Sequence, residues 1–249
     1  MIHLKTDKEI YEMRKAGELT YQLLDLVGQM IKPGVSTLEI DKMVHGEILN
    51  SNAFPGTLGY RGFKHSCCTS VNDVICHGIP SDYRLKEGDI LNVDISPRLN
   101  GWYGDSSRMF TVGEVSDTAN KLISTTETAL IGAIQCVRVG DNLSEIGKGI
   151  EAVIFSISNF SIVEDYVGHG IGRSFHEDPA VFHYNRPTGV KFQKGMVFTI
   201  EPMINEGTKE WIMLDDGWTV KTKDGLLSAQ MEHTIAINSK GDVEVISLP

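Results

Sequence analysis

The sequence is poor in cysteine and has no apolar stretch long enough to cross a membrane. None of its four cysteines has Cys-x-x-Cys spacing, and Cys67 and Cys68 are neighbours, which is poor geometry for a mutual disulfide. The first residues, MIHLKTDKEI, also lack the apolar segment of a signal peptide. These absences predict a reduced, cytoplasmic protein that does not enter a membrane.

Positive charge is scarce as well. The sequence has 23 Lys and Arg residues against 33 Asp and Glu residues, which gives a formal net charge of -10. Phosphate binding needs clustered basic residues, so nucleic acid is not expected as a partner. A solvated acidic surface accounts for most of this charge, and metal ligands are the alternative for part of it.

The sequence contains no low-complexity tract and no linker rich in Pro or Ser. Its 249 residues are 41% hydrophobic, which is ordinary for a globular protein that can bury a sizeable core.

Four amphipathic helices are indicated by the residues at their starts. Capping boxes, in which a Ser or Thr is followed three residues later by Glu, begin at Thr6 and Ser36. Ser116 or Asp117 begins the third helix, and Asn142 begins the fourth with Glu145 three residues later.

Strand patterns lie between these helices, at residues 89–95, 196–200 and 233–237. Asn100-Gly101 after the first of them is typical of a hairpin turn. Helices combined with hairpins predict an α+β fold, with a largely antiparallel sheet covered by helices on one face.

A weak internal repeat has an offset of about 106 residues. Gly34-x-x-x-Leu38-Glu39-Ile40 resembles Gly140-x-x-x-Ser144-Glu145-Ile146. Gly88 and Gly195 are each followed six residues later by an acid, Asp94 or Glu201. Two matches at nearly one offset indicate two related halves, although two ordinary helix-turn-strand units would give a similar pattern.

Five residues stand out as candidate metal ligands. Asp94 and Glu201 lie in or directly after apolar strands, where an uncompensated carboxylate is costly. Asp105 follows the predicted hairpin, Glu232 precedes a predicted strand, and His169 lies between glycines that permit close backbone approach. Each alone is more typical of a structural hydrogen-bonding residue, so the interpretation depends on the five together.

Four converging carboxylates would repel one another strongly without cations. Two divalent ions supply the matching positive charge, and bridging carboxylates hold such ions roughly 3.5–4 Å apart. One imidazole with oxygen donors suits Mn, Fe, Co or Zn, and the sequence does not choose among them.

A series of short motifs spans nearly the whole chain and together resembles the type I methionine aminopeptidases of the bacterial short form, within the M24 metallopeptidases. The motifs are Cys76-His77-Gly78-Ile79-Pro80, Asn92-Val-Asp94, Gly104-Asp105, Gly168-His-Gly-Ile-Gly-Arg-Ser-Phe-His176, Phe198-Thr-Ile-Glu201-Pro202, Asp216-Gly-Trp218 and Gln230-Met-Glu232-His233. The resemblance implies the pita-bread fold with two pseudo-symmetric halves. We therefore expect one catalytic domain over residues 1–249 with no N-terminal extension, and halves at roughly 1–112 and 113–249.

The resemblance also implies the roles of the ligands. Asp94 would chelate one metal, Asp105 and Glu232 would bridge both, and His169 and Glu201 would complete the shell of the other. The two divalent ions would be Co, Mn, Fe, Zn or Ni, and would activate a water molecule.

By the same resemblance His77 and His176 face the scissile peptide. Glu201 is placed to take a proton from the attacking water and pass it to the leaving amine. His176 would donate to the developing oxyanion, and His77 would hold the peptide nitrogen or orient the substrate.

The implied activity is removal of the initiator methionine from nascent polypeptides that have a small second residue. The methionine pocket is narrow and apolar, and its implied lining, beside His77 and His176, is Tyr60, Phe63, Cys68, Phe175 and Trp218. Core packing is the alternative role for each aromatic residue.

The chain departs from the family pattern at three positions. Val167 and Thr57 stand where relatives commonly have Cys, and Phe63 stands where many have Tyr. These changes alter the expected details of the pocket and its sensitivity to thiol inhibitors, but they do not alter the expected reaction. The family also implies a Na or K ion at a loop matching Asn72, Val74 and Ser228.

Other functions on this fold are less consistent with the sequence. A proline-directed peptidase of the same fold usually has an additional N-terminal domain, and a type II enzyme has a long insertion that the 25 positions between His176 and Glu201 leave little room for. A non-catalytic peptide-binding module would typically lose metal ligands. We expect a monomer that has at most transient contact with the ribosome.

Overall fold

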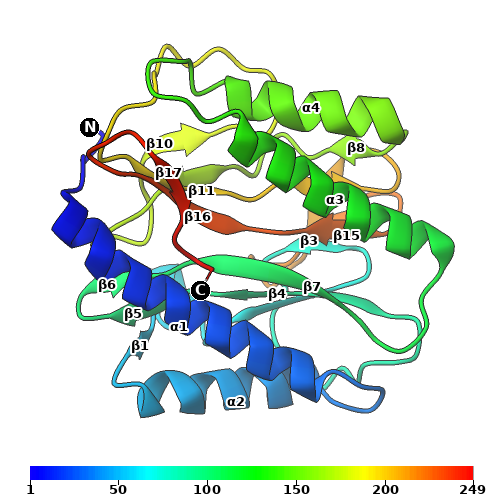
Figure 1. Cartoon of the computed structure of the whole chain (residues 1–249). Helices are drawn as coiled ribbons and strands as arrows, with labels where there is room; N and C mark the ends of the chain where they lie inside the picture. Colours follow the sequence, from blue (N-terminus) through cyan, green and yellow to red (C-terminus); the bar gives the residue numbers. More distant parts are fainter. Residues whose placement is uncertain (249) are drawn as a thin grey trace.

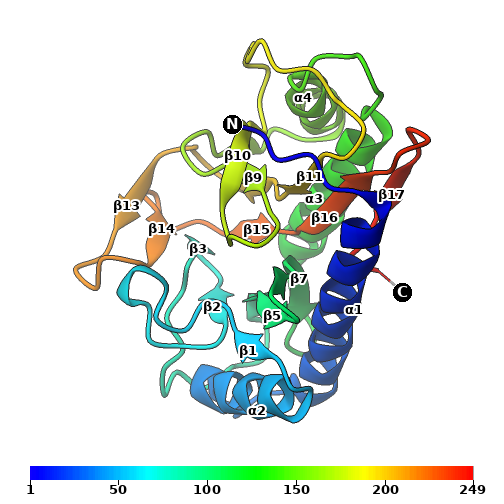
Figure 2. The same ribbon diagram turned by 90° about the vertical axis from the view of Figure 1, so that its left-hand side faces the viewer.

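The computed structural model describes residues 1–248, and it layers helices over small antiparallel sheets (Figure 1). Its α-helices are α1 (Asp7–Met30), α2 (Thr37–Asn50), α3 (Asp117–Gln135) and α4 (Glu145–Ile157). Figure 2 shows α1, α3 and α4 on the side away from the hairpin β13–β14, with α2 at the bottom. The expected α+β architecture, with helices covering one face of the sheets, is confirmed.

The first half of the chain forms two three-stranded sheets. One contains β1 (Phe54–Pro55), β5 (Pro97–Leu99) and β6 (Trp102–Tyr103). The other contains β2 (Cys68–Val71), β4 (Ile90–Ile95) and β7 (Ser106–Thr111). A 3₁₀ turn, η1 (Tyr60–Gly62), lies between β1 and β2.

The second half adds one five-stranded sheet and two further sheets. The largest contains β10 (Glu177–Val181), β9 (Gly168–Gly170), β11 (Val197–Ile200), β16 (His233–Ile237) and β17 (Val243–Val245). The others contain β15 (Ser228–Gln230), β12 (Met203–Asn205) and β8 (Ser161–Ile162), and β13 (Trp211–Met213), β14 (Val220–Thr222) and β3 (Val74–Cys76). Because β3 comes from the first half, this last sheet joins the two.

Both predicted capping boxes are confirmed. In α2 the Ser36 hydroxyl accepts a hydrogen bond from the Glu39 amide at 3.2 Å, and the Glu39 carboxylate accepts one from the Ser36 amide at 2.7 Å. Thr6 and Glu9 do the same at the start of α1. These bonds satisfy amides that a helix start otherwise leaves unpaired.

The predicted start of α4 is wrong by two residues. Asn142 does not cap the helix, which begins at Glu145 after Ser144. Asn142 instead pairs with Lys191 in an isolated bridge, and its side-chain oxygen accepts a hydrogen bond from the Ser144 amide at 3.1 Å. That extended pairing holds Asn142 out of the helix, so a turn intervenes.

The predicted hairpin at Asn100-Gly101 is confirmed, and it joins β5 to β6. Leu99 pairs with Trp102, and both turn residues have positive φ, 53° and 84°, as a type I′ turn requires. The hairpin is an excursion between β4 and β7, which pair with each other over their full length.

Equivalent contacts recur in the two halves at offsets of 106 and 107 residues. The hydrogen bond from the Gly34 amide to the Leu85 carbonyl matches the one from the Gly140 amide to the Phe192 carbonyl. The isolated bridges Ser36–Arg84 and Asn142–Lys191 have the same offsets. These contacts support the expected relation of the halves, and the boundary near residue 112 stays a prediction.

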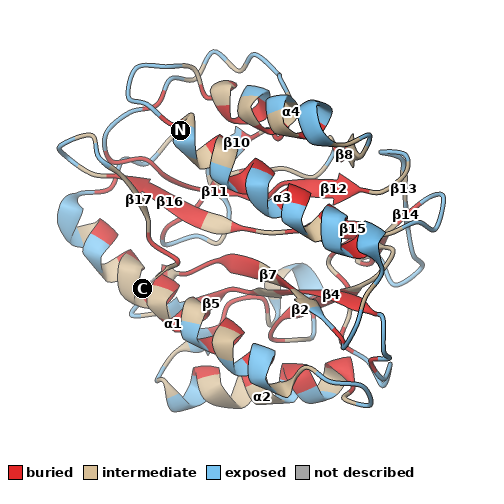
Figure 3. Cartoon of the chain, turned by 45° about the vertical axis from the view of Figure 1, so that its right-hand side comes forward, coloured by how far each residue is buried: buried red, intermediate tan, exposed pale blue. Residues whose placement is uncertain are grey.

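Apolar residues are buried between the helices and the strands, as the red inner stripes of Figure 3 show. Residues of α1 and α2 pack with Leu91 and Val93 of β4, and residues of α3 and α4 pack with Phe198 of β11. Burial of one such side chain stabilises the fold by about 1.5–3 kcal/mol. The helices thus cover one face of the strands, and polar residues can gather at their other side.

Within residues 1–248, none of the helices combines the length and the apolar character that a membrane crossing demands.

Candidate metal centre

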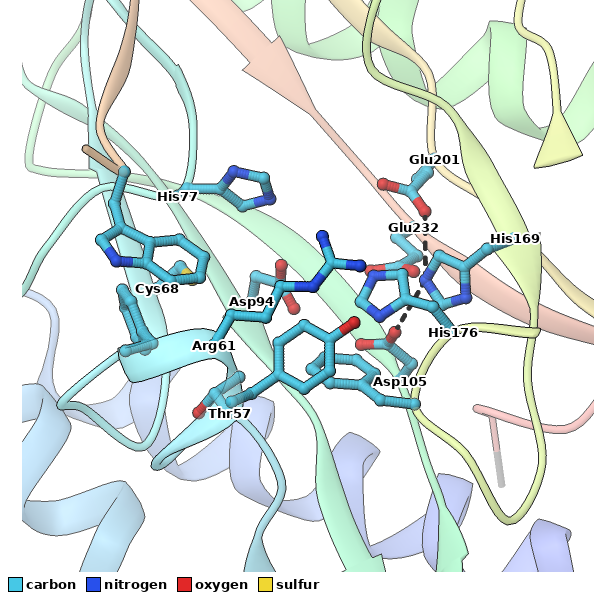
Figure 4. A pocket seen from close by; sticks show the side chains of 14 residues that line it. Thr57, Arg61, Cys68, His77, Asp94, Asp105, His169, His176, Glu201 and Glu232 are labelled. Carbon is cyan, nitrogen blue, oxygen red and sulfur yellow. Dashed lines mark ion pairs between the residues drawn. The ribbon is translucent and has the colours of Figure 1, made fainter. Parts of the chain in front are cut away.

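One cavity gathers every residue that the sequence suggested for binding the divalent metals and the substrate (Figure 4). Its lining consists of Asp94, Asp105, His169, Glu201 and Glu232, then Tyr60, Phe63, Cys68, His77, Phe175, His176 and Trp218, and finally Thr57 and Arg61. The sequence therefore predicted which residues come together. The individual roles assigned to them stay predictions.

Strand register places the two acids of the first half side by side. Asp94 lies in β4 opposite Ser107 of β7, and Ile95 lies opposite Ser106. Asp105 directly precedes Ser106, so its carboxylate emerges next to that of Asp94. The Ser96 hydroxyl donates to the Asp105 carboxylate at 2.7 Å and fixes its orientation.

The remaining three residues come from the second half. Ile200 and His233 pair across β11 and β16, so Glu201 and Glu232 lie just beyond the end of this pairing. Gly170 of β9 pairs with Phe198 of β11, which brings His169 to the same end. An isolated bridge between Ser107 and Glu232 joins the acids of the two halves.

The glycines beside His169 are required by close backbone packing. A β-carbon at Gly168 would lie 2.4 Å from the Thr199 carbonyl oxygen, and one at Gly170 would lie 2.1 Å from the Asp178 carbonyl oxygen. Only glycine allows β9 to approach its neighbours this closely. The strand can therefore bring its histidine down onto the carboxylates.

His169 presents one ring nitrogen to the acids. Its Nε2 lies 3.5 Å from an Asp105 oxygen and 3.7 Å from a Glu201 oxygen, and Nδ1 lies 2.9 Å from the Gly170 carbonyl oxygen. A carbonyl can only accept, so Nδ1 carries a proton and donates it. This leaves Nε2 facing the carboxylates, an orientation typical of metal-binding histidines.

The compact part of the cluster consists of Asp105, His169 and Glu232. One potential ligand atom from each lies within 4.8 Å of the others. Asp94 and Glu201 line the same cavity around this group.

Burial and mutual repulsion disfavour the charged carboxylates. Burial, followed by repulsion from Asp105 and Glu201, raises the pKa of Asp94 well above its usual value, and the pKa of Glu232 shifts the same way for the same reasons. Burial raises the pKa of Glu201 to about 7, even though nearby His169 opposes the shift. One buried Asp94 oxygen has no hydrogen-bond partner. This donor set fits divalent cations, which would favour the charged forms.

Two hydrogen-bonding residues, Thr199 and Gln230, hold the Glu201 carboxylate in place. The Thr199 hydroxyl donates to Glu201 at 2.8 Å and accepts from the His169 amide at 2.9 Å. The Gln230 amide donates to the other Glu201 oxygen at 3.3 Å. Thr199 and Gln230 were not among the residues predicted from the sequence. The signal was present, because positions i and i+2 along a strand share a face, and Thr199 precedes Glu201 by two.

His77 and His176 border the cavity without joining the compact cluster. Burial lowers the pKa of His77. Burial and the nearby positive groups of His169 and Arg61 lower the pKa of His176 to about 3, so its imidazole is neutral near pH 7. The ring centroids of His176 and His169 are 4.0 Å apart, which places His176 against the ligand cluster.

Aromatic residues form the apolar end of the cavity. Phe63 and Trp218 meet edge to face at 5.0 Å, and Tyr60 and Phe175 do the same at 5.0 Å. Cys68 is buried beside them, and this burial raises the pKa of its thiol.

Of the three departures from the family pattern, two lie in the cavity. Thr57 and Phe63 belong to its lining, and Val167 does not. The Thr57 hydroxyl donates to the His65 carbonyl at 2.9 Å, so it also closes the loop that carries Phe63.

The residues suggested for a monovalent cation lie elsewhere. The Ser228 amide donates to the Asn72 carbonyl at 2.9 Å, and Val74 follows two residues later in β3. Asn205 pairs with Ser228 across β12 and β15, and its buried side-chain oxygen has no partner. The Asn72 carbonyl oxygen and the Asn205 side-chain oxygen are suitable ligands for a Na or K ion, and the presence of that ion stays a prediction.

A buried ion pair supports the loop that carries His176. Lys5 Nζ lies 2.6 Å from a Glu177 oxygen, and the Lys5 side chain is only 1% exposed. The other Glu177 oxygen accepts a hydrogen bond from the Ser174 amide at 3.2 Å. Residues far apart in the sequence thus fix the backbone on both sides of His176.

Comparisons with known proteins support the interpretation of this cavity as a metal site. Residues 11–239 match the metallopeptidase family M24. Methionine aminopeptidase A of Synechocystis sp. is 48% identical over 249 residues, which cover 99% of this chain and 98% of that protein. The crystal structure of methionine aminopeptidase from Rickettsia prowazekii superposes with a TM-score of 0.97 at 46% identity, and covers both chains completely.

A more distant likeness concerns the fold alone. An Xaa-Pro dipeptidase from Bacillus anthracis superposes with a TM-score of 0.78 at 21% identity, covering 98% of this chain and 61% of that one.

We expect metal binding to stabilise the protein, and Asp94→Asn to have opposite effects with and without metal. At a metal concentration one hundred times Kd, the wild type should gain about 2.7 kcal/mol, or roughly 5–10 °C in Tm. Without metal, Asp94→Asn should raise Tm because it removes one repelling carboxylate. With metal it should gain less than the wild type because it has lost a ligand.

Differential scanning calorimetry with and without Mn²⁺ or Co²⁺ measures both effects. Asp82→Asn is the control, since Asp82 is exposed and outside the cavity. Equal gains on metal addition for Asp94→Asn and the wild type would remove Asp94 from the ligand set.

Lys5→Met should destabilise the protein by about 3–5 kcal/mol, because it leaves Glu177 partly buried without its partner. It should also lower kcat through the loop that carries His176. Urea unfolding and steady-state kinetics measure the two effects. Lys223→Met is the control, because the pair of Lys223 with Glu210 is exposed, and little change is expected there. Unfolding curves that coincide for both variants would contradict the prediction.

Proposed function

Because the chain belongs to metallopeptidase family M24, we propose that it removes the N-terminal methionine from nascent proteins and peptides with a small second residue. It is a hydrolytic enzyme that acts with divalent metal, and among the methionine aminopeptidases it is of the type I, bacterial short form. The observation that carries the proposal is the single cavity in which the ligand cluster adjoins an aromatic pocket.

Two divalent ions, of Co, Mn, Fe, Zn or Ni, would be held by Asp94, Asp105, His169, Glu201 and Glu232. When bound, such ions supply Lewis acidity to a water molecule and to the substrate carbonyl. The raised pKa values of the acids and the orientation of His169 Nε2 support this ligand set.

Glu201 would move the proton of the reaction. A carboxylate beside the attacking water can accept a proton from that water and return it to the leaving amine. Thr199 and Gln230 hold its two oxygens and so fix the direction of transfer.

His176 and His77 would contact the scissile peptide. A neutral imidazole donates through one nitrogen, so His176 can hydrogen bond to the oxyanion as it develops. His77 lies on the other side of the cavity in Figure 4, with its ring 6.1 Å from that of Trp218, where it can hold the peptide nitrogen.

The methionine side chain would enter the aromatic end of the cavity. Phe63, Cys68 and Trp218 offer polarisable apolar surface, which suits a thioether. The substrates would therefore be nascent polypeptide N-termini. We propose that the enzyme acts in the cytoplasm as a monomer, with only transient contact with the ribosome.

A panel of short peptides tests the function. After metal is removed and Mn²⁺, Fe²⁺ or Co²⁺ is restored, we expect release of methionine from Met-Ala-Ser, and little release of the first residue from Leu-Ala-Ser or Ala-Pro. Chromatography of the products measures this. Preferred cleavage before proline would assign a prolidase activity, and absence of cleavage with every metal would favour a peptide-binding module.

Glu201→Gln should lower kcat by at least about 10²-fold, the range expected for loss of a positioned proton-transfer group. Metal content, measured by mass spectrometry, separates loss of proton transfer from loss of a ligand. Glu210→Gln is the matched control, because Glu210 is exposed and pairs only with Lys223. Near-normal turnover in Glu201→Gln would refute the proton shuttle.

A further inference from the structure

One cation lines a cavity that otherwise contains acids, histidines, apolar residues and Thr57. Among residues 1–248, Arg61 is the only Lys or Arg in its lining. The residue is exposed, so it stands at the mouth of the cavity. The arginines of this part of the chain that form ion pairs are Arg14, Arg84 and Arg108, which leaves Arg61 without a carboxylate partner.

The backbone holds Arg61 in a defined place. Its φ is 48°, in the left-handed region that side chains rarely adopt, within the turn η1. Hydrogen bonds close the turn on both sides, from the Gly59 amide to the Phe63 carbonyl at 2.7 Å and from the Phe63 amide to the Tyr60 carbonyl at 2.9 Å. An uncommon conformation that is held in this way at a cavity points to a use for the side chain.

The guanidinium lies one layer outside the proposed catalytic groups. It sits 5.4 Å from the centre of the Tyr60 ring, and that ring stacks on His176 at 5.1 Å. Figure 4 shows the side chain extending past Tyr60 toward the region between Asp94 and His176. It therefore lies next to the place that the proposed function gives to the scissile bond, on the exposed side of the cavity.

This position fixes which part of a substrate passes Arg61. If the methionine side chain enters the aromatic end and His176 contacts the scissile carbonyl, the following residues must leave through the mouth. The second residue is small, so the third is the first whose side chain can vary freely there.

Charge then determines which side chains at the third residue of the substrate bind more tightly because of Arg61. The chain carries a net charge of -10, and four carboxylates lie in the cavity, so an acidic peptide would meet repulsion. Bound divalent ions would neutralise the inner acids and leave the guanidinium free. Guanidinium groups bind carboxylates through paired hydrogen bonds.

We propose that Arg61 binds a carboxylate at the third residue of the substrate, and so determines which methionine-bearing chains are processed efficiently. The inference rests on the proposed function. The carboxylate is the side chain of Asp or Glu in a longer chain, or the main-chain terminus of a tripeptide. Arg61 contributes to substrate selection and takes no part in the proton transfer.

The experiment compares the peptide amides Met-Ala-Glu-Ser and Met-Ala-Gln-Ser, which differ only in the charge of residue three. For the wild type, kcat/KM should be about threefold to fivefold higher for the Glu peptide, the size expected of a partly exposed ion pair. The difference should lie mainly in KM and should shrink at 0.5 M KCl. Met-Ala-Ser as free acid and as amide tests the terminal carboxylate separately.

Three variants sharpen the test. Arg61→Gln should abolish the preference for Glu, and Arg61→Lys should keep part of it, because the charge remains while the paired donors are lost. Arg186→Gln is the control, since Arg186 is exposed and packs over the Phe182 ring outside the cavity. That control should keep the wild-type ratio.

Titration calorimetry of the Glu201→Gln protein with the same two amides, after mass spectrometry has shown that it retains metal, measures binding without turnover. A Glu-to-Gln affinity ratio that falls when Arg61→Gln is added supports the inference. If methionine is released but both ratios are the same with and without Arg61, the inference is wrong and the proposed function stands. If no peptide is cleaved with any metal, the proposed function is wrong, and equal binding of the two amides then overturns the inference too.

Discussion

The mutual repulsion of four carboxylates in one cavity is the constraint on which the rest of the structure depends. Burial and proximity raise the pKa of Asp94 and Glu232, and bring that of Glu201 to about 7. The fold therefore holds together a cluster that opposes its own charge until cations bind. The free energy that offsets this repulsion comes chiefly from the apolar cores between the helices and the strands.

That constraint explains why strand registers and hydrogen bonds from several parts of the fold all position residues in the cavity. The β4–β7 register sets Asp94 beside Asp105, and the β11–β16 register brings Glu201 and Glu232 to one end of their strands. Hydroxyl and amide donors then hold individual oxygens in place. A site assembled from strand ends can be rigid, because the hydrogen bonds of a sheet fix the backbone of each ligand residue.

Features with a local cause could be predicted from the sequence. Capping boxes and the Asn100-Gly101 turn depend on a few neighbouring residues, and acids next to apolar strands signalled the ligands. Asn142 failed as a helix cap because its pairing with Lys191 is long-range. The Lys5–Glu177 pair spans 172 positions, so no local pattern announces it. Arg61 lies in a turn in which its φ is positive, a conformation that its residue type does not favour, so the sequence does not indicate it.

The bridge between Ser107 and Glu232 has a consequence for the order of events during synthesis. Asp94 and Asp105 emerge early, whereas Glu232 is the last of the five ligands to be translated. A growing chain cannot close the site before the second half has docked on the first. The complete set of five candidate ligands therefore exists only when both halves have been made and have docked.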